Sequence, residues 1–347
     1  MKIEDIARLA NVSKSAVSLA INGKAGVSEK TRKRILKIAE ENNYIPLRNT
    51  GNRIKKKTTI RLVVCKSPDL ITEQYHNLPF FNELISYLSI GVNEYPYNLV
   101  ISTFDESSII EDLKEVEKEQ PSEGIILLGT NLGKKKVRLI HKYYSNLVIL
   151  DTHHPDIDAS FVSINNFLGG YSAADYLIQQ GHKRISYIMG TPRITNFEER
   201  KSGFFSRLEE ENLSIPNEYF FQLPAMEIKD GRDIREEFQK LTKLPTAIFC
   251  ENDYMAISMI KCLKTLDINV PEQISVVGFD DIQESRVISP ELTTLQVNKK
   301  EMAIQALALL DKQINKSITS KHIQVNTSLI ARKSSQPAKE VIGSPEG

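Results

Sequence analysis

The chain has 347 residues, 41% hydrophobic and 26% charged, which is enough to build two or three globular domains. It contains no run of about 18 apolar residues, and this excludes a membrane-spanning helix. Residues 1–60 carry 14 Lys and Arg against 5 Asp and Glu, a net charge of +9, whereas the whole chain has +1. A basic N-terminal segment ahead of an acidic remainder favours binding to phosphates.

Three short helices are predicted before residue 46. Apolar residues recur at helical spacing from Ile3 to Ala10. Ser13 is a suitable N-cap for the second helix, Gly23 suits its end, and Ser28 suits the start of the third. Two helices joined by a three-residue turn, with a third packed across them, form a helix-turn-helix. An ordinary three-helix bundle with a basic face fits the same pattern, but the charge favours DNA binding.

In a helix-turn-helix, the N-terminal part of the second helix enters the major groove. We therefore expect Lys14, Ser15 and Ser18 to reach base edges, while Arg32 lies nearer the phosphate backbone. The other candidate DNA contacts are Ala16, Leu19, Asn22 and Arg53.

Several short runs, in this order and spacing, resemble the N-terminal domain of the LacI/GalR family of bacterial transcription regulators. They are Asp5-Ile6-Ala7, Ala10-Asn11-Val12-Ser13, Ala16-Val17-Ser18, Ile21-Asn22-Gly23, Val27-Ser28, Thr31-Arg32 and Tyr44-Ile45-Pro46. The likeness continues to about Arg332. It implies an all-α helix-turn-helix domain over residues 1–46, a hinge over 47–59, and a two-lobed α/β core over 60–332 like that of periplasmic sugar-binding proteins.

Two positions depart from the family pattern. Leu19 stands where many members have a base-reading arginine, so we expect it to meet a thymine methyl group instead. In the family the hinge folds on DNA and inserts a leucine into the minor groove, but here Arg53 occupies that position. The basic run Lys55-Lys56-Lys57 follows it, so we expect a hinge that bends DNA less and depends more on charge.

From Ile60 onward, predicted strands alternate with predicted helices. Such repeated βα units form parallel sheets with helices on both faces, and two sets predict two lobes with a cleft between them. The first set has strands over 60–64, 99–102, 124–128 and 147–150, with helices over 80–94, 109–119 and 134–144. The second set has strands over 161–164, 185–189, 219–222, 247–250 and 275–279, with helices over 170–180, 197–211, 230–240 and 254–266.

The family resemblance places the lobe boundaries. It implies a first lobe of about 60–163 and 296–316, and a second lobe of about 164–295 and 317–332. Residues 333–347, rich in Ser, Pro and Lys, are predicted to be a disordered tail.

Polar residues follow several predicted strands, where ligands bind in open α/β sheets. Asp151, Asn252 and Asp280 lie at such positions, and Arg200 lies early in a predicted helix. Planar groups of this kind can pair with sugar hydroxyls, although any one of them could instead be a helix cap or a turn residue. The resemblance implies that Arg200, Asn252 and Asp280 contact an effector, with Asp151 a weaker match.

An aromatic pair, Phe80 and Phe81, begins the first helix of the core. The family resemblance implies that this segment lines the cleft, where a ring could pack on a sugar face; plain core packing is the alternative. Met226 is a loose candidate for a second stacking position, since the chain has no tryptophan.

The sequence gives little support for an enzyme, a cofactor or a metal site. No glycine-rich phosphate loop and no nucleophile elbow occurs. The His153-His154-Pro155 segment fits a turn better than a set of metal ligands. Three distant cysteines in apolar segments indicate free thiols in a reducing cytoplasm, and Met1 leads directly into an amphipathic helix without a secretory signal.

Together these features predict a cytoplasmic, ligand-responsive transcriptional regulator that is not an enzyme. The resemblance implies a repressor of carbohydrate-utilisation genes, binding a near-palindromic double-stranded DNA operator as a homodimer, with a sugar in the cleft as effector. One alternative is a corepressor-dependent regulator that responds to a non-sugar metabolite. A sugar-binding receptor without a DNA-linked role is a more remote one, since a receptor would lack the basic N-terminal segment.

Overall fold

The computed structural model describes residues 3–21, 24–42, 57–67, 78–230, 232–317 and 319–339. The chain divides into two compact units, Met1–Lys57 and Thr58–Gly347. Two of the candidate DNA contacts, Asn22 and Arg53, lie outside the described residues, as do residues 47–56 of the predicted hinge. The last two residues of that hinge, 58 and 59, belong to the first strand of the second unit.

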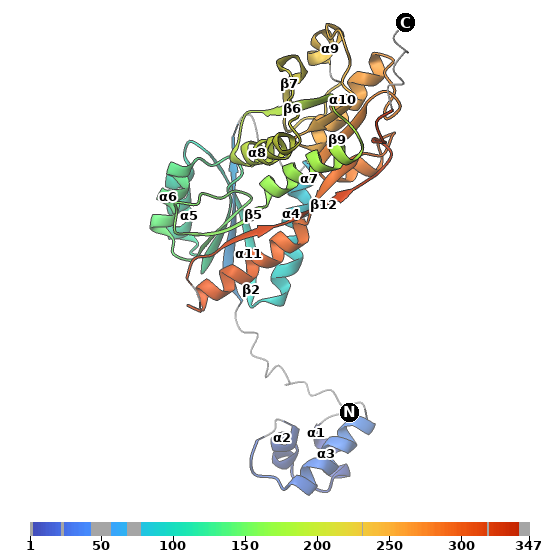
Figure 1. The fold of residues 1–347 in the computed structure, drawn as a ribbon. Helices are drawn as coiled ribbons and strands as arrows, with labels where there is room; N and C mark the ends of the chain where they lie inside the picture. Colours follow the sequence, from blue (N-terminus) through green and yellow to red (C-terminus); the bar gives the residue numbers. More distant parts are fainter. Residues whose placement is uncertain are drawn as a thin grey trace, which may run out of the picture. The chain divides into compact units, whose positions relative to one another are not determined.

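The first unit contains the three predicted helices, α1 (Ile3–Leu9), α2 (Lys14–Ile21) and α3 (Glu29–Glu41) (Figure 1). The Ser13 hydroxyl accepts a hydrogen bond from the Ala16 amide at 3.1 Å, and so caps α2. Ser28 caps α3 in the same way, accepting from the Thr31 amide at 3.3 Å. Apolar side chains from all three helices form one small core: Ile6, Ala7, Ala10, Val17, Ala20, Ile35 and Ala39.

The second unit has two six-stranded sheets, each belonging to one lobe (Figure 1). The first lobe's sheet is parallel throughout, in the order β11-β5-β4-β3-β1-β2. Its strands are β1 (Thr58–Lys66), β2 (Tyr97–Asp105), β3 (Gly124–Leu128), β4 (Leu147–Leu150), β5 (Ser160–Ile164) and β11 (His322–Val325). Its helices are α4 (Pro79–Gly91), α5 (Ile109–Glu119), α6 (Lys134–Tyr143) and α11 (Lys299–Ile314).

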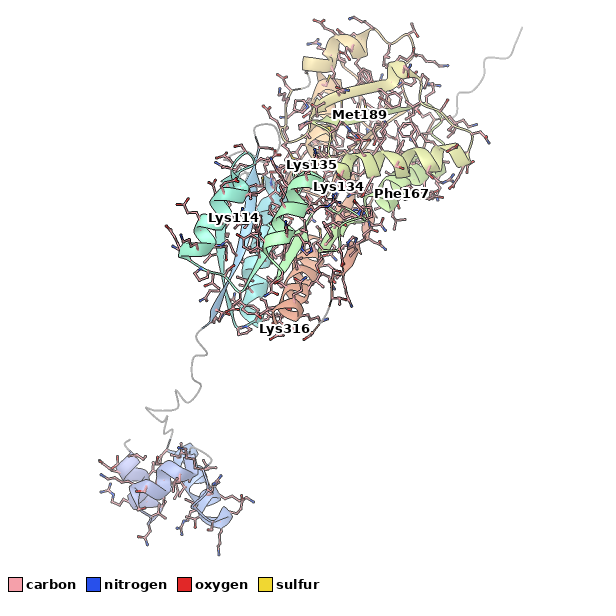
Figure 2. All side chains as sticks on the ribbon, turned by 90° about the vertical axis from the view of Figure 1, so that its left-hand side faces the viewer. Lys114, Lys134, Lys135, Phe167, Met189 and Lys316 are labelled. Atoms are coloured by element: carbon pink, nitrogen blue, oxygen red, sulfur yellow. The ribbon has the colours of Figure 1, made fainter. Side chains whose placement is uncertain are left out.

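The second lobe's sheet has the order β12-β10-β9-β8-β6-β7 and is parallel except for β12. Its strands are β6 (Ile185–Thr191), β7 (Phe220–Pro224), β8 (Ala247–Cys250), β9 (Ser275–Asp280), β10 (Thr293–Val297) and β12 (Thr327–Ile330). Its helices are α7 (Asn166–Gln179), α8 (Thr195–Glu210), α9 (Arg232–Gln239) and α10 (Asp253–Thr265). Figure 2 labels Lys114 and Lys316 on the first lobe, and Phe167 and Met189 on the second.

The central strands are buried along their whole length because helices cover both faces of each sheet. Every residue of β3, β4, β8 and β9 is buried, which explains their continuous apolar sequences. Among the described residues, no helix is long and apolar enough to cross a bilayer.

Three predicted details of the lobes are wrong. The periodicity places the strand over 161–164 in the second set, but β5 pairs with β4 in the first sheet, in agreement with the implied lobe boundary at about residue 163. Residues 317–332 were expected in the second lobe, but β11 pairs with β5 of the first. Both sheets were predicted to be parallel, but the chain changes lobe between β11 and β12, and β12 pairs antiparallel with β10, so the second sheet is mixed. Both late strands have four residues, too few to show which sheet receives them.

The predicted disordered tail is also wrong for residues 334–339. Ser334 is fully buried, and its carbonyl oxygen accepts from the Val276 amide at 2.7 Å. Further along, the Ala338 amide donates to the Gln180 carbonyl at 2.7 Å. This polar segment is ordered because its backbone and hydroxyl groups find partners on the second lobe. Residues 340–347 lie outside the described part of the chain.

Candidate functional site

A small pocket lies between the two lobes, and residues of both form its walls. All six residues predicted to contact an effector line it: Phe80, Phe81, Asp151, Arg200, Asn252 and Asp280. The remaining lining residues are Thr130, Ile194, Asn196, Phe197, Met226 and Tyr254.

The aromatic wall comes from the start of α4. Pro79 occupies the first turn, where its missing amide hydrogen costs nothing, and the two phenylalanines follow it. Phe80 and Phe81 contact each other edge to face, with ring centroids 5.3 Å apart and an interplanar angle of 89°. Both side chains are at most 5% exposed, so they pack in the core and line the pocket at once.

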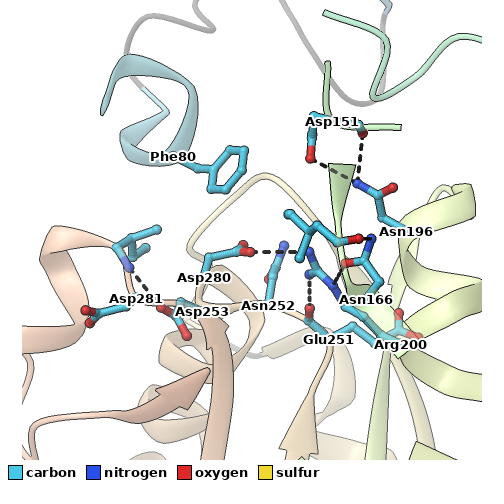
Figure 3. A network of polar contacts seen from close by, with 12 residues as sticks. Phe80, Asp151, Asn166, Asn196, Arg200, Glu251, Asn252, Asp253, Asp280 and Asp281 are labelled. Carbon is cyan, nitrogen blue, oxygen red and sulfur yellow. Dashed lines mark hydrogen bonds and ion pairs between the residues drawn. The ribbon is translucent and has the colours of Figure 1, made fainter. Parts of the chain in front are cut away.

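Arg200 occupies the centre of the second lobe's wall and is 3% exposed (Figure 3). Its guanidinium donates to Asn166 Oδ1 at 2.9 Å and to Asp280 Oδ1 at 3.3 Å. The guanidinium carbon also lies 3.7 Å from the centroid of the Phe279 ring. These contacts fix the cation in place, since a buried guanidinium is stable only with most of its donors satisfied.

Close packing of α7 on α8 allows Arg200 to reach this position. A Cβ atom on Gly170 would come within 1.9 Å of the Arg200 carbonyl oxygen, and one on Gly203 within 1.9 Å of the Phe167 carbonyl oxygen. Only glycine fits at these two positions, so the two helices lie in backbone contact beside the pocket.

Asp151 follows β4 and joins the lobes at the pocket. Its carboxylate accepts from the Thr130 hydroxyl at 2.5 Å and from Asn196 Nδ2 at 3.3 Å. Asn196, from α8 of the second lobe, also donates to the Asp151 carbonyl oxygen at 3.1 Å. Burial raises the pKa of Asp151 to about 7, against the opposing effects of the Thr130 hydrogen bond and the Arg200 charge.

Asp280, the last residue of β9, supplies the second carboxylate. Burial raises its pKa, and the positive charges of Arg200 and Lys299 oppose that rise. The neighbouring Asp281 has a different role, because its carboxylate pairs with Arg332 at 2.6 Å and Arg286 at 2.9 Å. Asp281 is therefore a structural residue of the second lobe, and it does not line the pocket.

Asn252 lines the pocket and is also the helix cap that the sequence left as an alternative. Its Oδ1 accepts from the Met255 amide at 3.0 Å at the start of α10, and its Nδ2 donates to the Ala225 carbonyl oxygen. Both ends of its amide thus already have protein partners, and a ligand would have to share them.

Several lining residues were not predicted. Thr130 lies two residues after the end of β3, so the rule that placed Asp151 after its strand could have found it. Asn196 and Tyr254 lie on helices, and their positions depend on partners across the cleft: the Tyr254 hydroxyl, for example, accepts from the Phe80 amide at 3.4 Å. Met226, only a loose candidate from the sequence, does line the pocket.

The candidate DNA contacts that the structure describes lie mostly on α2. Lys14 and Ser15 are exposed, while Ala16, Ser18 and Leu19 are half-buried. The Lys14 ammonium pairs with Glu4 at 2.7 Å. Arg32 is half-buried on α3 and donates to the Lys24 carbonyl oxygen, so part of its donor capacity holds the first unit together. Among the described residues, no group of three or more His, Cys, Asp or Glu is placed to hold a metal ion.

Comparisons with known proteins match both parts of the chain. The family model for bacterial regulatory proteins of the lacI family matches residues 2–47, and a periplasmic binding protein-like domain matches residues 174–335. HTH-type transcriptional repressor PurR from Pasteurella multocida is 31% identical over 337 residues, covering 96% of this chain and 98% of that protein. Probable HTH-type transcriptional repressor ExuR from Bacillus subtilis is also 31% identical, with coverage of 96% and 97%.

Solved structures share the fold. The transcriptional regulator CelR–cellobiose complex has a TM-score of 0.70 at 24% identity, covering 96% of this chain and 99% of that one. The lac repressor dimer bound to operator and the anti-inducer ONPF has a TM-score of 0.70 at 20% identity, covering 97% and 99%. These matches confirm the predicted family and the two-lobed fold. The chain therefore belongs to the lacI family of bacterial regulatory proteins, DNA-binding regulators of transcription whose relatives named above are transcriptional repressors.

Proposed function

We propose that this protein is a repressor whose affinity for a double-stranded DNA operator is controlled by a small molecule bound in the interlobe pocket. One observation carries the proposal: the six residues expected to contact an effector, far apart in the sequence, line a single pocket with walls from both lobes. A ligand that contacts both lobes stabilises one lobe arrangement over others, which is what an effector must do.

The chemistry of the pocket favours an uncharged, hydroxylated ring as the effector. Phe80, Phe197 and Met226 offer apolar surface for the face of a ring. Asp151 and Asp280 offer carboxylate oxygens that accept from hydroxyl groups. We expect a neutral sugar, because its hydroxyl groups can donate hydrogen bonds to the side chains of Asp151 and Asp280 while its ring packs on the apolar wall.

Sugars bound to other members of this fold support the same class. The CelR structure holds cellobiose, and a LacI family transcriptional regulator from Enterococcus faecium, at a TM-score of 0.67 and 23% identity, holds ribose. A non-sugar corepressor is the competing proposal, since aromatic rings and side-chain amides can also hold a nucleobase. We further propose repression of carbohydrate-utilisation genes, with the sugar releasing the operator.

For the DNA interface we propose that Lys14, Ser15 and Ser18 contact base edges and that Leu19 contacts a thymine methyl group. The exposed positions of Lys14 and Ser15 on a short, capped helix support this. We also propose a homodimer that reads two half-sites. Large apolar side chains on the first lobe's surface, Ile90 at 68% and Ile101 at 42% exposed, support a protein interface there.

A ligand screen tests the proposal. Purified protein is heated with sugars, sugar phosphates and purines, because a ligand that binds the folded state raises the melting temperature. A sugar should raise it, and Asp280→Ala should abolish that shift, since removing a buried charged partner costs about 2–5 kcal/mol of binding. DNA selected from a random pool should still bind the variant.

The matched control is Asp267→Ala, which removes an exposed carboxylate of the same lobe and should leave the shift intact. An Asp280→Ala variant that binds the sugar at wild-type strength would overturn the assignment of the pocket. A rise in melting temperature with purines and with no sugar would favour the competing proposal, a non-sugar corepressor.

A further inference from the structure

Lys299 is a buried lysine behind the effector pocket. It begins α11, where the chain returns from the second lobe to the first, and it is 4% exposed. Its ammonium donates to the carbonyl oxygens of Asp280 at 3.0 Å and Asp281 at 3.4 Å, and it pairs with Glu83 Oε2 at 3.1 Å. Burying an ammonium is unfavourable unless such partners satisfy it, so the position calls for a specific role.

The two carbonyl groups that Lys299 binds belong to an unusual stretch of backbone. Asp280 has φ 113° and Asp281 has φ 49°, so two consecutive non-glycine residues have positive φ. Such residues persist only where their surroundings hold them. The side chain of Asp281 is held by Arg332 and Arg286, while the backbone of the pair is held by Lys299. Figure 3 shows the result, an Asp280 carboxylate directed at Arg200.

The third partner of Lys299 lies on the opposite wall. Glu83 belongs to α4, the same helix that carries Phe80, and the Lys299 ammonium lies 5.4 Å from the centroid of the Phe80 ring. One side chain therefore contacts the turn that carries the acidic wall of the pocket and the helix that carries its aromatic wall.

We propose that Lys299 is a positioning residue of the effector pocket: it holds the strained turn after β9 so that the Asp280 carboxylate faces the pocket, and it links that turn to α4 through Glu83. The inference rests on the proposed effector function of the pocket. It implies that a ligand contact at Asp280 reaches α4 of the first lobe directly, through two contacts of one ammonium group.

The charges around Asp280 make the role measurable. Asp280 interacts with Arg200 on α8 and Lys299 on α11, and with two further carboxylates, Asp151 after β4 and Asp253 on α10. The Tyr254 hydroxyl also interacts electrostatically with Asp280. Because the Lys299 charge lowers the pKa of Asp280, removing it should raise that pKa further. Replacing Lys299 should then lower the stability of the folded protein more at a pH where Asp280 is ionised than at a pH where Asp280 is protonated.

The pKa of Asp280 is first measured by NMR titration of its carboxyl carbon, and thermal midpoints of the full-length protein are then compared at one pH below that pKa and one pH above it. Lys299→Met should lower the midpoint more at the higher pH. Lys299→Arg, which keeps the charge, should recover much of the thermal midpoint that Lys299→Met loses. Lys300→Met removes an exposed lysine one residue away and should change neither value. In an Asp280→Asn background the effect of Lys299→Met should lose its pH dependence. A loss equal at both pH values, or one still pH-dependent in that background, would overturn the proposal.

Hydrogen exchange of α4 amides tests the second contact. Both Lys299→Met and Glu83→Gln should speed exchange in residues 79–91 roughly tenfold, the loss expected for one charged hydrogen bond. Glu83→Gln also decides the matter should Lys299→Met fail to fold, since unchanged exchange in this variant would overturn the link to α4. If no sugar binds the pocket while these effects hold, the proposed function fails and the positioning role stands.

Discussion

Two aspartates of the pocket have positive φ angles, a backbone conformation that residues other than glycine rarely adopt. Asp151 has φ 65° and Asp280 has φ 113°. Each is held by contacts from the other lobe: Asn196 donates to Asp151, and Lys299 to the Asp280 carbonyl oxygen. Strain of this kind is expected where a site needs a side chain in one direction, because a relaxed backbone would point it elsewhere.

Asp151 should make stability depend on pH. Burial raises its pKa to about 7, well above the value of about 3.9 in an unfolded chain. The folded protein thus retains a proton that the unfolded chain has lost, and stability falls as pH rises through this window. The asparagine in Asp151→Asn cannot titrate. Between about pH 5 and pH 8 the thermal midpoint of this variant should therefore rise relative to that of the wild type.

Asp267→Asn is the matched control, since Asp267 also has positive φ, at 56°, but is exposed. Its midpoint should follow the wild-type curve at every pH. An Asp151→Asn curve parallel to that of the wild type across this range would show that Asp151 is already ionised in the folded protein.

At the scale of elements, strands with continuous apolar sequences could be predicted and short strands could not. The expected bounds of β3, β4 and β8 match the structure, because each strand is covered on both faces and its burial dictates its composition. β11 and β12 have four residues each with mixed exposure, so composition alone could not assign them to a sheet. Their sheets are decided by distant partners, β5 and β10.

The packing of α7 on α8 gives a prediction at this scale. Gly203→Ala would place a Cβ atom within 1.9 Å of the Phe167 carbonyl oxygen, so the helices must separate. Overpacking of this kind costs about 1–3 kcal/mol. Because α8 carries Arg200 and Asn196, the variant should also weaken effector binding. Unfolding and ligand titration measure the two effects.

Gly133→Ala is the control, because a Cβ atom there meets nothing within 4 Å. It should change neither stability nor binding. A Gly203→Ala protein as stable as this control would mean that the two helices separate without cost.

At the scale of the whole molecule, the residues of the pocket were predicted more accurately than the division of the chain into lobes. All six expected pocket residues line one pocket, since each lies at or just after the end of a strand or in the first two turns of a helix, and these ends meet between the lobes. Asn196 and Tyr254 escaped prediction because their roles depend on cross-lobe contacts, to Asp151 and to Phe80. Periodicity within one segment carries no information about such contacts.

The division of charge gives the last prediction. Residues 1–60 hold a net charge of +9 in a chain of +1, so DNA binding should be strongly salt-dependent. Each phosphate contact contributes a slope of about 0.9 in log affinity against log salt, so replacing Lys55, Lys56 and Lys57 with alanine should reduce the slope by about 2–3. Salt titration on DNA selected from a random pool measures this.

The control replaces Lys135 and Lys142, two exposed lysines of α6 in the second unit, with alanine. It should leave the slope of log affinity against log salt unchanged. Circular-permutation gels on the same DNA report bending. Ile54, one residue after Arg53, is the apolar side chain that could act as a wedge if the register shifts. If contact through charge replaces such a wedge, the bend should be weak and should survive Ile54→Ala. A strong bend that disappears in Ile54→Ala, with a slope indifferent to the three lysines, would show instead that an apolar side chain opens the minor groove.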